Sequence, residues 1–320
     1  MENIINPNAK CFCVLSDERY LIFGLTFCES IHKYMSSDYV IHYLATDDAT
    51  YKKLLYIAEA YQLNIYPHKL LEIEKTNAYK EIEKRYPRRG GKQDQDSPLH
   101  WGLTPLFSHY IMEKFNSPIM YADTDILFYR DPEEIFACCE DRSVGLVTHK
   151  NVSLNADPKT SPPYNVGILY FNNNENGKKT LEWWMDHIVH RKNLPDGRKG
   201  GGWLDQALLS FFPQICPQNE IKLIDESIGH GGPWGLNKAK IENGNYIWNS
   251  KGILHDKTTT QPLSFFHFSH FLPNYDNNSW DYDYFGELRL KKNIKEREDV
   301  KLLYQDYYNK CRQVKEVYEI

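Results

Sequence analysis

The chain has 320 residues and a formal net charge of -5, with 38 Lys and Arg against 43 Asp and Glu. This length permits one large α/β domain or two small ones, and the mild negative charge gives no overall attraction to nucleic acid, so we expect no nucleic-acid partner. The seven cysteines fit neither a paired disulfide framework nor a four-ligand zinc pattern, which favours a reducing cytoplasm.

Membrane-spanning segments are not expected from the sequence. Met1 to Lys10 is polar, unlike a signal peptide, and no apolar run approaches the roughly 20 residues of a membrane helix. We therefore expect a cytoplasmic protein whose contact with a membrane, at its inner face, is at most peripheral.

Strand and helix signals alternate along the first half of the chain, which is the pattern of a sheet covered by helices. Thr46-Asp47-Asp48 is typical of a helix N-cap, because short polar side chains there accept hydrogen bonds from free backbone amides. The expected elements are strands at Lys10–Leu15, Tyr39–Ala45 and Leu63–Tyr66, helices at Glu18–Tyr34 and Ala49–Tyr61, and a mobile surface loop from Arg85 to Ser97.

The second half adds strongly apolar strands and a charged tail with helical periodicity. The expected elements are helices at Leu103–Phe115, Lys178–Arg191 and Leu204–Phe212, strands at Pro118–Ala122, Val166–Phe171 and Leu263–Phe268, a Gly-rich turn before Leu204, and a helical tail from Lys295 to Tyr318. We find no repeat and no low-complexity linker. The sequence therefore predicts one α/β domain over residues 1–290 and a helical C-terminal appendage over residues 291–320.

The segment MYADTDILFYRDP carries two carboxylates one residue apart, Asp123 and Asp125, between two apolar runs. Two acids in a turn can simply cap or solubilise it. Ligands of open α/β sheets, however, bind beyond the carboxyl ends of the strands, and two carboxylates there can hold one hard divalent cation. A phosphatase of the haloacid dehalogenase type also uses D-x-D, but on its first strand and with Thr or Val where Leu127 stands here.

Two later segments carry polar groups that could serve the same site. Asp205 and Gln206 follow three glycines at the start of a helix, where a carboxylate and an amide either cap the helix or contact a ligand. The strand FFHFSHF sets His267 and His270 among aromatic residues. Each histidine is either a buried structural residue or a metal ligand, and His267 suits the third position of a metal site.

The order of these features resembles the GT-A glycosyltransferases, in particular the retaining group that contains glycogenin and the bacterial lipooligosaccharide galactosyltransferases. The resemblance runs from about Cys11 to Phe271. SDERYLIFGLTFCESI is similar to the nucleotide-binding segment of that group, Asn165-Val166-Gly167 to its N-x-G strand, and GGWLDQALLS to its turn at the anomeric centre. The resemblance implies donor contacts at Leu15, Ser16, Asp17, Tyr20, Asp123, Thr124, Asn165 and Gly167.

The resemblance also implies a fold, a reaction and a cofactor. The fold is the GT-A, Rossmann-like mixed sheet flanked by helices. The reaction moves a sugar from a nucleotide-diphosphate sugar, with a UDP-sugar favoured, to a hydroxyl of a glycan, a glycolipid or a surface polysaccharide. The cofactor is Mn2+ or Mg2+, bound by Asp123, Asp125 and His267.

Two basic residues of that group are missing from this sequence. The helix WGLTPLFSHY has no Lys or Arg, and HFSHFLPNY stands where the group has H-x-x-G-x-x-K-P-W. The segment GHGGPWGLNKAKI is similar instead to a loop of bacterial surface-polysaccharide transferases. We therefore expect Lys238 or His270 to assist at the donor phosphates.

The stereochemical course stays open at this point. If the reaction retains configuration, Gln206 steadies an oxocarbenium-like state; if it inverts, Asp205 is the base that deprotonates the acceptor. A sugar- or nucleotide-binding protein without activity is the alternative class.

Overall fold

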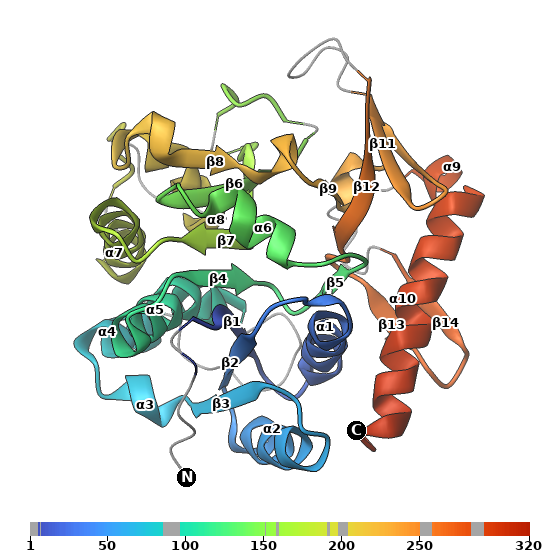
Figure 1. Ribbon diagram of the computed structural model, residues 1–320, viewed down its shortest axis with the longest axis horizontal. Coiled ribbons are helices and arrows are strands. Elements are labelled where there is room, and N and C mark those ends of the chain that lie inside the picture. Colours follow the sequence, from blue (N-terminus) through green and yellow to red (C-terminus); the bar gives the residue numbers. More distant parts are fainter. Residues whose placement is uncertain are drawn as a thin grey trace.

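A computed structural model describes residues 6, 8–85, 97–150, 152–157, 160–190, 193–197, 204–249, 258–282 and 291–320. A seven-stranded sheet forms its centre, and helices cover both faces (Figure 1). In spatial order the strands are β3 (Ile65–Lys69), β2 (Tyr39–Ala45), β1 (Lys10–Ser16), β4 (Ile119–Ala122), β7 (Tyr164–Phe171), β6 (Val144–Thr148) and β8 (Ile221–Leu223). β7 runs antiparallel to β4 and β6, and the remaining pairs are parallel. The mixed sheet confirms the expected α/β class.

A second sheet joins the first at the end of β4. Its strands are β10 (Ala239–Glu242), β11 (Asn245–Asn249), β12 (Thr258–His267), β5 (Ile126–Phe128) and β9 (Gly229–Gly231), which pairs with β12. A separate hairpin follows, made of β13 (Leu272–Asn274) and β14 (Ser279–Asp281). Because β5 lies in the second sheet and β4 in the first, the three residues between them bridge the two sheets.

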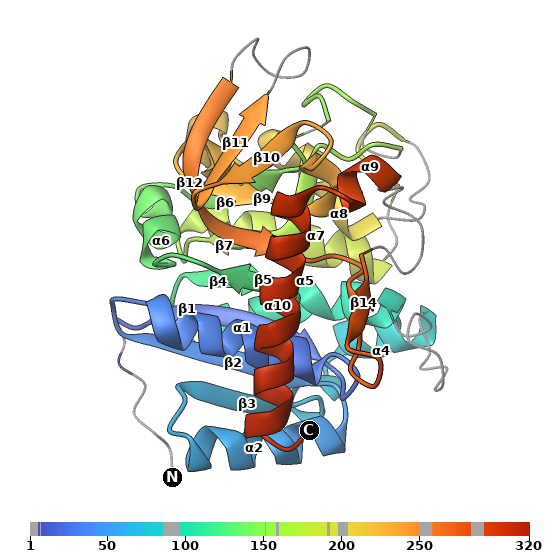
Figure 2. The same cartoon turned by 90° about the vertical axis from the view of Figure 1, so that its right-hand side faces the viewer.

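The helices are α1 (Leu21–Tyr34), α2 (Asp48–Ala60), α3 (Leu71–Glu74), α4 (Asn77–Arg85), α5 (Ser97–Phe115), α6 (Glu133–Cys139), α7 (Glu175–His190), α8 (Leu204–Leu208), α9 (Lys292–Lys295) and α10 (Glu298–Val317). Most helices pack in two layers, one on each face of the large sheet, and the long C-terminal helix α10 lies beside them against α1 (Figure 2). In the described part of the chain, no helix combines the length and apolar composition that a bilayer crossing requires.

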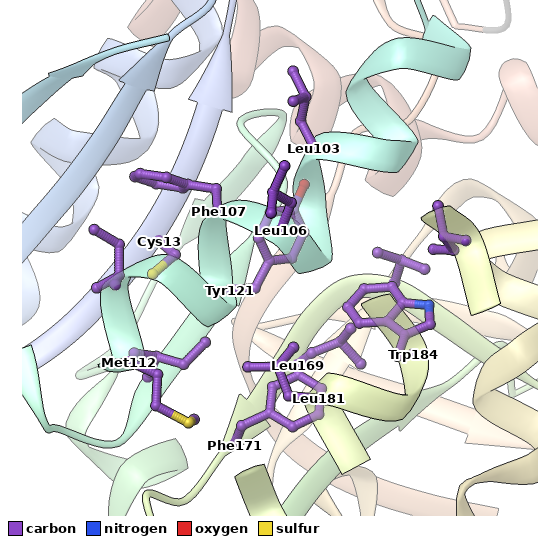
Figure 3. Close-up of a cluster of buried hydrophobic side chains, with 14 of the residues drawn as sticks. Cys13, Leu103, Leu106, Phe107, Met112, Tyr121, Leu169, Phe171, Leu181 and Trp184 are labelled. Carbon is purple, nitrogen blue, oxygen red and sulfur yellow. The ribbon is translucent and has the colours of Figure 1, made fainter. Parts of the chain in front are cut away.

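Alternation along β1 divides the core between the two faces of the sheet. Cys11 and Cys13 point to the cluster that α5 and α7 cover, and Phe12 and Val14 point to the cluster under α1, α2 and α6. Figure 3 shows the first cluster, where Trp184 of α7 lies near Leu169 and Phe171 of β7. A central strand buried on both faces reads as a continuous apolar run, which is why this strand could be predicted from the sequence.

The C-terminal helix α10 lies along α1 and closes a third, aromatic cluster with the end of β12. The rings of Phe268 and Tyr307 stack at 3.8 Å between centroids, and the ring of Phe23 in α1 also stacks with Tyr307, at 6.2 Å. The expected tail helix is thus present. The predicted boundary at residue 290 lies outside the described residues.

Several element boundaries differ from expectation for local reasons. α1 begins at Leu21, because the Asp17 carboxylate accepts hydrogen bonds from the amides of Arg19 and Tyr20 and forms a turn there. α5 begins at Ser97, six residues before the expected start. The helix expected over Leu204–Phe212 changes to a 3-10 helix at Leu209, near Pro213, which cannot supply an α-helical amide. The predicted loop before Ser97 and the Gly-rich turn before Leu204 lie outside the described residues.

Two fully buried histidines, His42 of β2 and His68 of β3, form a chain of hydrogen bonds that ends at Glu72, near one edge of the large sheet. Nδ1 of His42 lies 3.0 Å from Nε2 of His68, and Nδ1 of His68 lies 3.1 Å from the carboxylate of Glu72. Since a carboxylate accepts, His68 donates from Nδ1 and accepts at Nε2 from His42. Burial, and then the charge of His68, lowers the pKa of His42 well below its usual value, and burial lowers the pKa of His68.

This pair predicts acid sensitivity of the folded state. Unfolding exposes both imidazoles, which then bind protons near the ordinary pKa of about 6.5. The free energy of unfolding should therefore be highest above that pH and should decrease as the pH is lowered further. His42→Gln keeps a donor for His68 and removes one titrating group, so its stability should depend less on pH, by up to about 1.4 kcal/mol per pH unit.

Urea denaturation at about pH 7 and pH 5 measures this difference. The matched control is His190→Gln, because the His190 side chain is 53% exposed. The control should lose as much stability as the wild type between the two pH values. An equal loss in the His42→Gln variant would contradict the account.

Candidate functional site

Asp123, Thr124 and Asp125 form the bridge between the two sheets. The Asp123 amide donates to the carbonyl of Gly167 in β7 at 2.9 Å, and the Phe268 amide donates to the carbonyl of Asp125 at 2.8 Å. Thr124 is buried. Both ends of the triplet are therefore held by main-chain bonds at the carboxyl end of β4, one to β7 of the first sheet and one to Phe268, directly after β12 of the second.

Three ligating groups converge at this bridge. Nε2 of His267, the last residue of β12, lies 3.0 Å from Oδ1 of Asp125 and 3.7 Å from Oδ2 of Asp123. One ligand atom from each of the three residues lies within 4.8 Å of the others. Two carboxylates and one imidazole suit Mn2+ and are compatible with Mg2+, so the residues present fit the expected ion.

The charges at this position are mutually dependent. Burial, and then repulsion from Asp125, raises the pKa of Asp123 against the opposing effect of His267. Burial also opposes ionisation of Asp125, but the charge and hydrogen bond of His267 outweigh it and lower the pKa of Asp125. Burial alone would lower the pKa of His267, and the two carboxylates raise it instead. A cation between the carboxylates would relieve this repulsion.

A tyrosine from the preceding strand fixes Asp123. The hydroxyl of Tyr121 donates to Oδ1 of Asp123 at 2.7 Å and accepts from Thr104 of α5 at 3.3 Å. This bond occupies Oδ1 and leaves Oδ2 on the side of His267. Tyr121 lies two residues before Asp123, which directly follows β4, so the alternation of the strand places both side chains on the same side.

The start of β7 lies against the same three residues. Asn165 accepts the Nδ1 hydrogen of His267 at 3.1 Å through its side-chain oxygen, and Gly167 lies beneath the imidazole. A Cβ atom on Gly167 would come within 2.5 Å of both His267 Nδ1 and Asn165 Oδ1. Glycine is therefore required at this position by close approach.

Asp205 and Gln206 reach this region from α8. Asp205 is buried; burial, with a further contribution from the charge of Asp123, raises its pKa to about 7. The side-chain oxygen of Gln206 accepts from Nδ2 of Asn165 at 3.1 Å and from the amide of Val166 at 3.3 Å. The structure thus brings the predicted pair beside the N-x-G strand.

The predicted nucleotide segment lies at the end of β1, on the same edge of the sheet as the end of β4. Leu15 and Ser16 are buried, and the Ser16 hydroxyl is bonded to the Tyr43 hydroxyl at 2.7 Å. Asp17 is bound to the guanidinium of Arg19. The ring of Tyr20 packs edge-on against Phe23 at 5.5 Å.

Lys238 and His270, the two residues expected to assist at the donor phosphates, lie in different parts of the structure. His270 follows β12 in the left-handed region, with a φ of 65°, and its charge contributes to the lowered pKa of Asp125. Lys238 is exposed and lines a groove on β10 and β11 with Lys240 and Asn249. Among the described residues, no contact connects Lys238 with the three ligating groups.

Two aromatic residues complete the site without having been singled out in the sequence. His149, after β6, and Trp234, after β9, pack edge to face at 4.9 Å between ring centroids. Trp234 packs in the same way on His267 at 5.3 Å. Trp234 belongs to the noted segment GHGGPWGLNKAKI, but no local pattern identifies His149, because its position depends on β6 pairing with β7.

A mixed α/β sheet with an acidic triplet after the fourth strand and a histidine from a second sheet beside it defines the GT-A fold. This is the fold of an active-site mutant of LgtC, to which the chain is 14% identical with a TM-score of 0.51, covering 87% of this chain and 95% of that one. A second structure is described as the galactosyltransferase LgtC with donor and acceptor sugar analogues. It has a TM-score of 0.47 at 13% identity and covers 71% and 77% of the two chains.

The sequence itself is similar to the uncharacterized protein YfnF of Bacillus subtilis, with 26% identity over 275 residues that cover 81% of each chain. No family model matches the chain.

The close approach at Gly167 gives a direct test of the site. Gly167→Ala should displace His267 and weaken Mn2+ binding about tenfold or more, because the imidazole can no longer meet both carboxylates. The increase in melting temperature with added Mn2+ measures this, since a ligand that binds the native state raises its stability.

The matched control is Gly145→Ala on β6, whose Cβ would meet Cys139 Sγ at 2.7 Å instead. It should lower the melting temperature but keep the response to Mn2+. A full Mn2+ response in the Gly167→Ala variant would count against the assigned ligands.

Proposed function

We propose that the protein is a glycosyltransferase that moves a sugar from a nucleotide-diphosphate sugar to an acceptor hydroxyl, with Mn2+ or Mg2+ as cofactor. The observation that carries this proposal is the convergence of Asp123, Asp125 and His267 at the carboxyl end of β4. That is the edge of an open α/β sheet where ligands bind, and it lies between two sheets that can each contact part of an extended donor.

The chemistry requires stabilisation of a leaving diphosphate, whose negative charge grows as the bond to the anomeric carbon breaks. A divalent cation held by Asp123, Asp125 and His267 would supply Lewis-acid stabilisation of that charge. His270 lies on the side of Asp125 and is the better of the two candidates for adding positive charge there.

The donor would extend across the ends of three strands. Its base and ribose would contact Leu15 and Ser16 at the end of β1 and Asp17 and Tyr20 just after it. We favour a UDP-sugar because of the family resemblance. Thr124 would lie beside the phosphates. The sugar would lie near Gly167 and Gln206, beside the start of β7.

Retention of configuration is the proposed course. A neutral amide, that of Gln206, would steady the oxocarbenium-like state by its dipole while the acceptor attacks from the side of the leaving group. The side-chain oxygen of Gln206 already accepts two hydrogen bonds, which does not favour covalent attack by that atom. An inverting reaction would instead use Asp205 as the base, and its pKa of about 7 is suited to proton transfer near neutral pH.

We propose a glycan, a glycolipid or a growing surface polysaccharide as the acceptor, met in the cytoplasm or at the inner face of the membrane. The aromatic face of Trp234 lies beside His267 and offers the apolar platform that sugar rings need.

Metal-dependent turnover tests the proposal. The purified protein should hydrolyse or transfer from a UDP-sugar with Mn2+ and lose this activity with a chelator. Asp123→Asn and Asp125→Asn should each lower kcat/KM about 100-fold or more, because each variant removes a ligand charge. The control Asp141→Asn changes a carboxylate that is 74% exposed and should behave as the wild type.

A panel of nucleotide sugars that gives no turnover with the wild type would identify the chain as a binding protein. Turnover that is equal in all three variants would reject the metal site.

The anomeric configuration of the product decides between Gln206 and Asp205. Proton NMR of the product formed early in the reaction should show the configuration of the donor. In that case Asp205→Asn should retain measurable transfer, since no base of that kind is needed. An inverted product, together with loss of activity in Asp205→Asn, would replace the retaining proposal.

A further inference from the structure

The side-chain amide of Asn165 connects His267, the candidate metal ligand, with Gln206, the residue proposed to act at the anomeric centre. Asn165 is the second residue of β7, is 7% exposed, and pairs with Val147 of β6. Its amide can accept two hydrogen bonds and donate two. All four are made inside the protein, two at the oxygen and two at the nitrogen.

Main-chain groups fix the direction of every one of these bonds. The backbone amide of Gly167 can only donate, and it lies 2.8 Å from the Asn165 atom Oδ1, which is therefore the oxygen. The same oxygen lies 3.1 Å from Nδ1 of His267, so His267 must carry its hydrogen on Nδ1. Nε2, which faces Asp123 and Asp125, is then the nitrogen that can present a lone pair to a cation.

The nitrogen of the Asn165 amide is fixed independently. The carbonyl of Pro162 can only accept, and it lies 2.7 Å from Nδ1 of His149, so His149 presents a lone pair at Nε2. Nδ2 of Asn165 donates to that lone pair at 3.1 Å. It also donates to the Gln206 oxygen, which the amide of Val166 identifies as an acceptor. Three separate backbone groups thus agree on one orientation.

We propose that Asn165 is a positioning residue that holds His267 in the Nδ1-protonated tautomer, with Nε2 directed at the cation, and that its amide does not contact the donor sugar. A sugar hydroxyl could bond to this amide only by displacing one of the four bonds already made. The inference rests on the proposed metal site, and it does not depend on the donor or on transfer.

Metal affinity without any donor tests the proposal. Mn2+ titration of the full chain, followed by EPR of the free ion, gives the dissociation constant. Asn165→Leu should raise it about 10- to 100-fold, the usual effect of losing a residue that orients a ligand. Asn165→Asp keeps an acceptor for the Nδ1 hydrogen and should stay within about threefold of the wild type.

A matched asparagine at the other end of β7 controls for the substitution itself. Asn173 bonds to Asn116 at 2.8 Å, and Asn173→Leu should bind Mn2+ as the wild type does. Should Asn165→Leu fail to fold, Asn165→Ser carries the same expectation, because its hydroxyl ends about one atom short of Oδ1. Wild-type affinity in the folded Leu or Ser variant, or equal losses in Asn165→Asp and Asn165→Leu, would overturn the proposal.

Kinetics at saturating Mn2+ separate positioning from sugar contact. The donor KM of Asn165→Leu should then lie within a few-fold of the wild-type value, whereas a KM that stays raised about tenfold or more would overturn the claim about the sugar. A wild type that binds Mn2+ but transfers no sugar would refute the proposed function and leave the Mn2+ titration a valid test of Asn165.

Discussion

The repulsion between two neighbouring carboxylates is the constraint on which the site depends. Asp123 and Asp125 are 31% and 18% exposed, and both face the imidazole of His267. Removing charges from water is costly unless they are paired, and one imidazole cannot fully neutralise two acids. The fold keeps them together by main-chain bonds in two sheets, which is the arrangement expected of a site prepared for a cation.

The same bridge explains how distant segments meet. β4 ends at the edge of the large sheet where the triplet lies. β7 runs antiparallel to β4, so its first residues lie at the same edge, and Ala122 pairs with Ile168. β5 then pairs with β12, whose register sets Ile126 opposite His267. The amide of Asn165 joins these two arrangements, because it bonds to His267 on one side and to Gln206 on the other. Metal ligation and sugar contact are therefore expected to be coupled through β7.

Much of the fold could be predicted from the sequence, because buried central strands such as Tyr39–Ala45 are continuous apolar runs with matching boundaries. The short strands β8 to β11 could not, since segments of three to five residues are too short to show a clear period. Asp123, Asp125 and His267 carry local signals, and the structure brings them together; that they bind a metal stays a prediction. His149 carries no local signal, because its neighbours come from β7 and from the turn after β9.

Pulsed EPR of bound Mn2+ tests the central claim most directly. The wild type with Mn2+ and UDP should show coupling to one histidine nitrogen and to phosphorus in the same species. The nitrogen coupling should disappear in His267→Gln, while a His149→Gln variant should keep it. Mn2+ that couples to phosphorus with no nitrogen in the wild type, or that keeps the nitrogen after loss of His267, would contradict the assignment of Asp123, Asp125 and His267 as one metal site.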